Sequence, residues 1–378
     1  MDASSIPPPL GERTQIDVRA IERELNELWK HAAGDGPESR SAVTRTCVLN
    51  LVVITSSSRA ALHITDVIAQ LTARHPNRAI VVSAMPGAGA PREAPLLDAW
   101  VQAHCQLPGP GRPQVCCEQI TIEARGAAVA RVPGTVLPLL VPDVPVMLWW
   151  PRGEPFDDPL FVRLSDLADR VIVDSATFAA PAAGLTRLAQ LLDRDLAISD
   201  LAWARLTPWR ELIAQFFDAA AMLPHLGRIA EVTVEYAARP GGATCWTQAL
   251  LLVGWLGSRL GWRPAGGVAG GEGRTRLVMQ RADGSDVQIE LHGAEPEADA
   301  TDRLASVVLE CPQARFSVMR GASPDAAIAR AEVAGMPPLQ RVVRLEQLSE
   351  VDLIAEELRL LGRDHAFEGA LRVAAVLT

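Results

Sequence analysis

The sequence predicts an α/β N-terminal domain with a mainly parallel sheet, followed by an α+β C-terminal domain with an antiparallel sheet. Residues 146–150 form an uninterrupted apolar run between two prolines, which is typical of a strand that is covered on both faces. Residues 274–281 and 286–291 flank Asp283-Gly284, a strong signal for an antiparallel hairpin. In a chain of 378 residues, two such different patterns indicate two domains.

The apolar run at residues 146–150 begins a β-loop-α-β unit. A helical stretch at residues 159–167 follows it, and then a second short β-branched run at residues 171–173. Two strands joined through a helix imply a parallel sheet. Ligands and partners meet such sheets at the carboxyl ends of the strands, which here are residues 150–152 and 174–175.

Other segments of the first half also show clear periodicity. Apolar residues recur at helical spacing from Val18 to Trp29 and again after Ser56, whereas other runs are continuous or alternate. We predict, in chain order, an amphipathic helix that ends near Gly34, strands at residues 46–54, 79–84 and 115–123, a helix that begins after residue 56, and a helix at residues 184–192.

The second half begins with alternation at residues 232–236 and a helix at residues 244–260 that is apolar all round, as a core helix is. We expect the glycines of residues 266–273 to form a linker. Beyond the hairpin we predict strands at residues 305–310, 315–319 and 341–345, a helix capped by Ser323-Pro324, and helices that begin at residues 349 and 364. The predicted division is an N-terminal extension with the amphipathic helix at residues 1–40, a parallel-sheet domain at 41–195 and an antiparallel-sheet domain at 196–378.

Composition excludes several classes of function. A net charge of −9 argues against broad binding to nucleic acid or anionic membranes, since both require a basic surface. The chain opens on a short, proline-rich segment without an apolar leader, so we expect a cytoplasmic protein. Six cysteines occur without a C-x-x-C motif or a histidine at ligand spacing, so we expect reduced thiols and no metal site.

No motif for catalysis or cofactor binding is present. The sequence lacks a G-x-S-x-G motif, a Walker loop and clustered histidines. Asp157 and Asp158 are adjacent before Pro159, which is typical of turn and helix-cap acids. The run at residues 86–91 resembles the start of a dinucleotide fingerprint, but it lacks the third glycine. We therefore predict no catalytic residues and no cofactor.

A tryptophan- and arginine-rich segment lies near the predicted joint between the domains. Residues 200–210 contain Trp203, Arg205, Trp209 and Arg210 around a bend between two predicted helices. The tryptophans can clamp the domains together, or the segment can form a partner-binding hot spot, because Trp and Arg are enriched in such spots. Both interpretations stay open on the residues alone.

Several long motifs of the chain, in the same order, resemble the OpcA family. These are Pro142-Asp143-Val144-Pro145-Val146 with Trp149-Trp150, and residues 157–161, 169–175, 200–210, 250–252, 254–256 and 261–262. The resemblance implies a non-catalytic protein that assembles or activates glucose-6-phosphate dehydrogenase, which opens the oxidative pentose phosphate pathway and supplies NADPH. Redox control through cysteines near the carboxyl end has been proposed for some members, but here the last cysteine is Cys311.

Two hypotheses follow. The first is that the chain is no enzyme, binds glucose-6-phosphate dehydrogenase and promotes its active oligomer by favouring one assembly state. The residues we expect at that contact, or in its immediate support, are Trp149, Trp150, Arg152, Trp203, Arg205, Trp209 and Arg210, although alternation favours a core position for Trp149. The alternative is a sugar-phosphate sensor or enzyme that uses a strand-end pocket. Its residues are Ser56, Ser57, Arg152, Asp174 and Ser175.

Overall fold

The computed structural model describes residues 14–15, 18–33, 43–87, 96–106, 114–194, 196–237, 244–266, 269–271, 273–294, 304–323, 325–360 and 362–378. The chain divides into two compact units. The first contains Met1–Pro151, Pro155–Val173 and Glu350–Leu361, and the second contains Arg152–Glu154, Asp174–Ser349 and Gly362–Thr378. The domain boundary at residue 195 stays a prediction.

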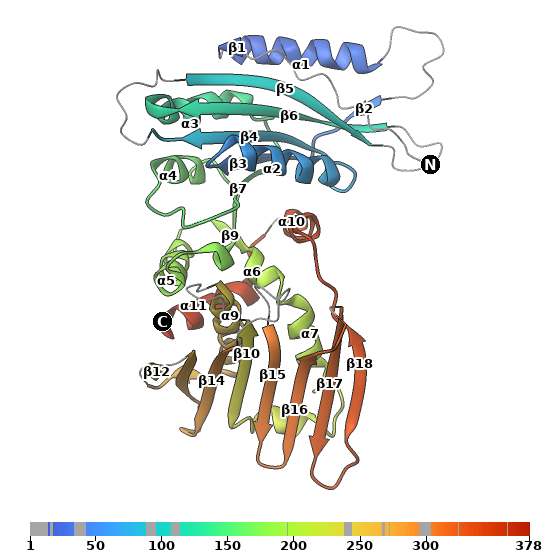
Figure 1. Ribbon diagram of the computed structural model, residues 1–378, viewed down its shortest axis with the longest axis vertical. Coiled ribbons are helices and arrows are strands. Elements are labelled where there is room, and N and C mark those ends of the chain that lie inside the picture. The colour runs from blue at the N-terminus through green and yellow to red at the C-terminus, as the bar shows by residue number, and fades with distance from the viewer. Residues whose placement is uncertain are drawn as a thin grey trace. The chain divides into compact units, whose positions relative to one another are not determined.

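The first unit is built on a mainly parallel sheet (Figure 1). Its strands lie in the order β1 (Thr14–Gln15), β5 (Leu96–Gln106), β6 (Gln114–Arg125), β4 (Asn77–Met85), β3 (Leu49–Thr55), β7 (Val146–Trp150) and β8 (Arg170–Val173), and β2 (Val43–Arg45) pairs with β6. The pairs of β3 with β4, β3 with β7, β7 with β8, and β4 with β6 are parallel. β5 runs antiparallel to both of its neighbours.

Helices cover this sheet with the faces that the sequence predicts. In α2 (Ser58–Leu71), the buried residues are Ala61, Ile64, Val67, Ile68 and Leu71, the stripe expected of an amphipathic helix. The other helices of this unit are α1 (Val18–Ala33), η1 (Gly126–Arg131), α3 (Val132–Val136), η2 (Leu137–Leu139), α4 (Pro159–Ser165) and α10 (Glu350–Arg359). The predicted β-loop-α-β unit is therefore β7, α4 and β8.

The first unit differs from the prediction in one strand and one disulfide. Strand β5 was not predicted, although Leu97, Ala99 and Val101 are buried at every second position. β5 places Cys105 directly opposite Cys116 on β6, and the two form a disulfide. The expectation of reduced thiols is therefore wrong for this pair, because the missed strand is the one that brings its two sulfur atoms together.

The second unit contains a mainly antiparallel sheet, and among its described strands only β10 and β14 run parallel to each other. Its order is β11 (Arg263–Pro264), β13 (Arg274–Gln280), β14 (Asp286–Ala294), β10 (Glu231–Ala237), β15 (Leu304–Cys311), β16 (Ala314–Arg320), β17 (Ala326–Val333) and β18 (Leu339–Arg344), and β12 (Ala269–Gly271) pairs with β13. The predicted hairpin is β13 and β14, and Gly284 in its turn has a φ of 85°, which suits glycine.

The helices of the second unit are η3 (Ser175–Thr177), α5 (Pro181–Leu191), α6 (Leu201–Ala204), α7 (Thr207–Gln215), α8 (Leu223–Leu226), α9 (Thr244–Leu260) and α11 (His365–Val376). Of these, α7 and α9 pack on one face of the sheet, and η3, α5 and α6 pack against α9. Short strand β9 (Ala197–Asp200) precedes α6. α9 is the predicted core helix, and residues 249–253 within it are fully buried. α11 packs against α9 and α5.

Two further expectations were wrong in the second unit. The helix predicted after Ser323-Pro324 is strand β17, because Ala327, Ala329 and Ala331 are buried at every second position while β16 and β18 pair on either side. The glycine-rich segment expected to be a linker contains β12. Residues 88–95, which include most of the run compared with a dinucleotide fingerprint, lie outside the described residues.

Among the helices that the structure describes, none combines the length and the apolar composition that crossing a bilayer requires.

Candidate functional site

Trp203 is a buried centre of the second unit. Its side chain lies on α6 with 3% of its surface exposed. The indole Nε1 donates a hydrogen bond of 2.9 Å to Oδ2 of Asp364, and the guanidinium of Arg210 lies 3.5 Å from the centre of the ring, a cation–π contact. Asp364 in turn caps α11, where its other oxygen accepts hydrogen bonds from two backbone amides. Trp203 therefore links α6, α7 and α11.

Trp209 is equally internal. It is 2% exposed on α7, and the guanidinium of Arg320 lies 5.6 Å from the centre of its ring. Arg320 also donates a 2.7 Å hydrogen bond to the carbonyl oxygen of Leu304. Trp203 and Trp209 have almost no exposed surface. Each therefore stabilises the packing of helices and strands within the second unit.

Arg205 and Asp174 form an ion pair in the second unit. The guanidinium donates to both carboxylate oxygens of Asp174, at 2.7 and 2.8 Å, the bidentate geometry that suits Arg best. Asp174 also caps η3 by accepting from the amide of Ala176. Both side chains therefore have structural partners within the unit.

Asp200 and Ser175 form a fully buried polar pair next to that charge. The Ser175 hydroxyl donates a 2.5 Å hydrogen bond to Oδ2 of Asp200, while the amides of Ser175 and Ala202 donate to Oδ1, each at 2.9 Å. Burial, and then the nearby charge of Asp174, raise the pKa of Asp200 to about 7. The structure thus places a carboxyl group that titrates near neutral pH inside the second unit.

The residues of the predicted strand-end pocket belong to two different units. Ser56 and Ser57 lie in the first unit, and Arg152, Asp174 and Ser175 lie in the second. Ser57 is the N-cap of α2, where its hydroxyl accepts a 3.2 Å hydrogen bond from the amide of Ala60. Ser56 is exposed, as is Arg152. Three of the five side chains are therefore engaged in local hydrogen bonds.

Trp149 and Trp150 differ as the alternation of β7 predicts. Trp149 is fully buried, which confirms the expectation of a core position. Trp150 is half-buried at the carboxyl end of the strand and makes an edge-to-face contact with Phe161, with ring centres 5.7 Å apart. Of the seven predicted contact residues, Arg152 is the one that is classed as exposed and not as buried or half-buried.

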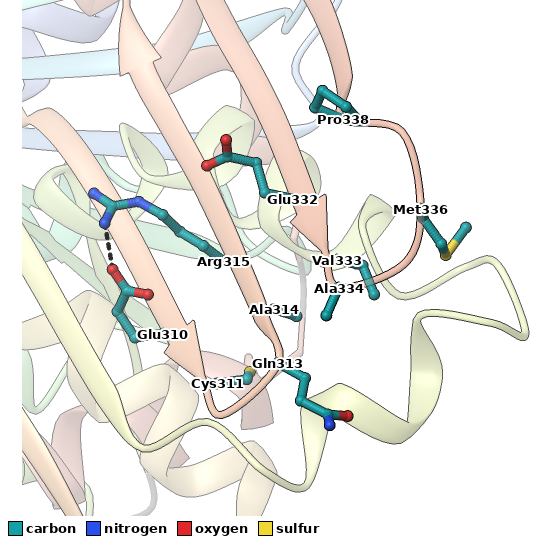
Figure 2. Close-up of a pocket in the computed structure, with 10 residues that line it drawn as sticks. All are labelled: Glu310, Cys311, Gln313, Ala314, Arg315, Glu332, Val333, Ala334, Met336 and Pro338. Atoms are coloured by element: carbon teal, nitrogen blue, oxygen red, sulfur yellow. Dashed lines mark hydrogen bonds and ion pairs between the residues drawn. The ribbon is translucent and has the colours of Figure 1, made fainter.

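A surface groove of the second unit was not anticipated from the sequence (Figure 2). It has a volume of about 450 Å³ and lies at the turn end of β15, β16 and β17, beside the loop that leads to β18. Glu310, Arg315 and Glu332 line one side, and the loop residues Met336 and Pro338 line another (Figure 2). The groove forms only because strands that are separate in the sequence pair with one another. No local motif in the sequence predicts that pairing.

The groove also contains Cys311, the last cysteine of the chain. Burial and the charge of Glu310 raise the pKa of its thiol to about 11, so the thiolate is scarce at neutral pH and the thiol is a poor nucleophile. Among the described residues, no group of three His, Cys, Asp or Glu side chains is arranged to hold a metal ion. The groove therefore offers mixed polar and apolar contacts.

Among the solved structures that resemble the chain is one that covers most of it. It is titled "Levoglucosan dehydrogenase, complex with NADH and L-sorbose", and it aligns with a TM-score of 0.50 at 10% identity over 88% of this chain and 96% of its own. At this identity the likeness concerns the fold alone.

Sequence relatives cover most of the chain. A protein of Nostoc punctiforme named "Putative OxPP cycle protein OpcA" is 30% identical over 319 residues, which are 81% of this chain and 66% of that protein. A protein of Synechocystis sp. with the same name is 39% identical over 150 residues, which are 40% of this chain and 30% of that protein. The chain thus matches two thirds or less of the length of these relatives.

Two family models match the chain in order. The first, described as "Glucose-6-phosphate dehydrogenase subunit N-terminal domain", matches residues 68–190, and the second, the "C-terminal domain" of the same subunit, matches residues 196–371. Because these two matches together take in well over half of the sequence, the chain belongs to the OpcA family of glucose-6-phosphate dehydrogenase subunits.

Proposed function

We propose that this protein is a non-catalytic subunit that binds glucose-6-phosphate dehydrogenase in the cytoplasm and promotes its active oligomer. The observation that carries the proposal is the match of both domains of a glucose-6-phosphate dehydrogenase subunit, in order, over residues 68–190 and 196–371. The relatives named as proteins of the OxPP cycle support the same pathway.

Such a subunit acts by selective binding. If the dehydrogenase exists in more than one assembly state, a protein that binds the active state more tightly shifts the population toward it. The size of the shift depends on concentration and on the ratio of the two affinities. The subunit contributes no reacting group, and its effect on the rate is that of an activator.

The alternative, a sugar-phosphate sensor or enzyme, has less support. Its predicted pocket would need Ser57, Asp174 and Ser175 to face a ligand, whereas Ser57 caps a helix and Asp174 is bound by Arg205. The Ser175 hydroxyl is fully buried against Asp200. These hydrogen bonds favour a structural role for the three side chains.

An activity assay tests the proposal. Purified protein is added at micromolar concentrations to the dehydrogenase of the same organism, and the rate of glucose 6-phosphate oxidation is measured. We expect the rate to rise with added protein and to saturate, and the protein alone to give no rate. An unchanged rate over the whole titration would refute activation, and turnover by the protein alone would refute the non-catalytic role.

Thermal unfolding of the isolated protein with glucose 6-phosphate serves as the control for the alternative. A ligand that binds the folded state raises the unfolding temperature. We expect no rise, because the proposed role requires the dehydrogenase and no small ligand. A concentration-dependent rise would favour the sensor.

A further inference from the structure

We infer that the face of the second sheet opposite its helices, which we call the open face, is the surface that docks on the dehydrogenase. The inference rests on the proposed function and adds a location to it. It is drawn from the strand registers, the burial and the charges of the second unit.

Alternation along the strands separates the open face from the helix-covered face. On β16, Phe316 and Val318 are fully buried, and the rings of Phe216 and Phe217 contact Phe316 on that side. Their neighbours Arg315 and Met319 are exposed. Because successive residues of a strand point to opposite faces, Arg315 and Met319 lie on the open face.

An apolar row crosses the open face. In the strand registers, Met319 of β16 lies opposite Ile328 of β17, and Ile328 lies opposite Val342 of β18. Met319 is 43% exposed and Val342 is 71% exposed, and Ile328 is half-buried. Three adjacent large apolar side chains form a continuous patch. Such patches on soluble proteins mark interaction sites more often than single exposed apolar residues do.

Three pairs of opposite charges lie on the open face. They form across or along strands at 2.5–2.8 Å, and they are Arg276 with Glu290, Arg315 with Glu310, and Arg330 with Glu332. The chain as a whole carries a net charge of −9, whereas each of these three pairs is neutral. A balanced, partly apolar face suits another folded protein rather than a polyanion.

The area of the open face fits a stable protein contact. Strands lie about 4.8 Å apart and rise about 3.3 Å per residue, so β10 and β13–β18 together present a face of roughly 700 Å². A standard protein–protein interface buries about 800 Å² on each partner. The open face is therefore large enough to carry most of one.

The groove of Figure 2 adjoins the open face and extends it. Glu310, Arg315 and Glu332 belong to both, and the groove adds the exposed side chains of Met336 and Pro338 (Figure 2). The loop that carries them contains Gly335, which has a φ of 82°. A flat face that ends in a groove can accept a projecting loop of the partner, which gives the contact a defined orientation.

The partner is assigned from the location of the face. All strands of the open face lie within residues 196–371, the segment that matches the C-terminal domain of a glucose-6-phosphate dehydrogenase subunit. A subunit of that enzyme needs a surface for it, and the open face combines apolar content, balanced charge and sufficient area. A second copy of this chain is the competing occupant, and the oligomeric state of the protein alone distinguishes it from the dehydrogenase.

The test uses charge substitutions in the apolar row. Val342→Asp and Met319→Lys each place a charge in the row on a different strand, and Val376→Asp on α11 is the matched control, because Val376 is 68% exposed and Val342 is 71% exposed. Binding of each full-length variant to the dehydrogenase is titrated, and thermal unfolding checks that each variant is folded.

We expect Val342→Asp and Met319→Lys to weaken binding by roughly tenfold or more, because a buried unpaired charge is costly at an interface, and Val376→Asp to bind like the wild type. Equal binding by all folded variants would overturn the open-face assignment while leaving the proposed function intact. Failure of the wild type to bind would instead remove the proposed function. If the wild type alone forms a dimer that Val342→Asp dissociates, the face belongs to a second copy and the assignment is wrong.

Discussion

At the scale of single residues, the second unit is held together by polar contacts between segments that are far apart in the sequence. Trp203 donates to Asp364, which is 161 positions away. Asp200 is fully buried against Ser175, and its pKa is raised to about 7. A carboxyl group whose pKa differs between the folded and the unfolded chain makes the stability of the protein depend on pH.

The raised pKa of Asp200 predicts the sign of that coupling. In the unfolded chain the carboxyl group has its ordinary pKa of 3.8, and in the folded protein its pKa is about 7. Both states hold the proton below about pH 4, and only the folded state holds it between about pH 4 and pH 7. The free energy of unfolding therefore falls as the pH rises through this window, by up to about 4 kcal/mol at 1.4 kcal/mol per pKa unit.

Asp200→Asn tests this prediction. The amide keeps an oxygen to accept from the backbone N–H groups of Ser175 and Ala202, but it does not titrate. We expect the difference in free energy of unfolding between wild type and variant to change between pH 5 and pH 8, with the wild type losing more stability on going to high pH. Urea unfolding followed by tryptophan fluorescence measures it. Parallel pH profiles would show that Asp200 does not titrate in this range.

Sequence patterns predicted the residues whose environment is local. Alternation in β7 placed Trp149 in the core, and Asp158 caps α4 as its position before Pro159 indicated. For Trp203, Trp209 and Arg205, the partners Asp364, Arg320 and Asp174 were beyond prediction, because they lie far away in the sequence. Tryptophan and arginine enrichment was a real signal of an organised region, but it did not distinguish a buried support from an exposed contact.

At the scale of elements, the packing of α9 on α11 sets a strict limit on side-chain size. A Cβ added at Gly254 in α9 would lie 2.2 Å from the carbonyl oxygen of Ala370 in α11. Backbone atoms cannot move aside as a flexible side chain can, so the two helices would have to separate. The close approach of the two helices therefore depends on glycine at this position.

Gly254→Ala is expected to lower the free energy of unfolding by about 2 kcal/mol or more through this overlap. Gly227→Ala is the control in the same unit, because a Cβ at Gly227 meets nothing within 4 Å and its φ is −75°. We expect the control to lie within about 0.5 kcal/mol of the wild type. Urea unfolding of the three proteins decides it, and equal midpoints would mean that α9 and α11 do not approach this closely.

Helices and strands whose apolar residues recur at a clear period were predicted. Elements whose residues favour both helix and strand were not. The hairpin of β13 and β14 combined alternation with Asp283-Gly284 and was found as expected. β17 was mistaken for a helix because Ser323-Pro324 resembles a helix start and alanine favours helices, while its pairing with two neighbouring strands outweighs that preference. The apolar row of the open face was missed because it is formed by registers between strands, which no single segment displays.

At the scale of the whole molecule, the proposed function rests on the family, and the inferred docking surface lies on the second unit. Both domain matches name a subunit of glucose-6-phosphate dehydrogenase. The tryptophans and arginines first considered for contact mostly stabilise the second unit, and the open face of its sheet presents the apolar row. We infer that the former group supports the surface and the latter makes the contact.

Sedimentation velocity of the protein mixed with the dehydrogenase of the same organism tests whether the two proteins form a complex. We expect a boundary that contains both proteins, sediments faster than either alone and grows with the concentration of this chain. Two boundaries at the positions of the separate proteins, at micromolar concentrations of each, would contradict it.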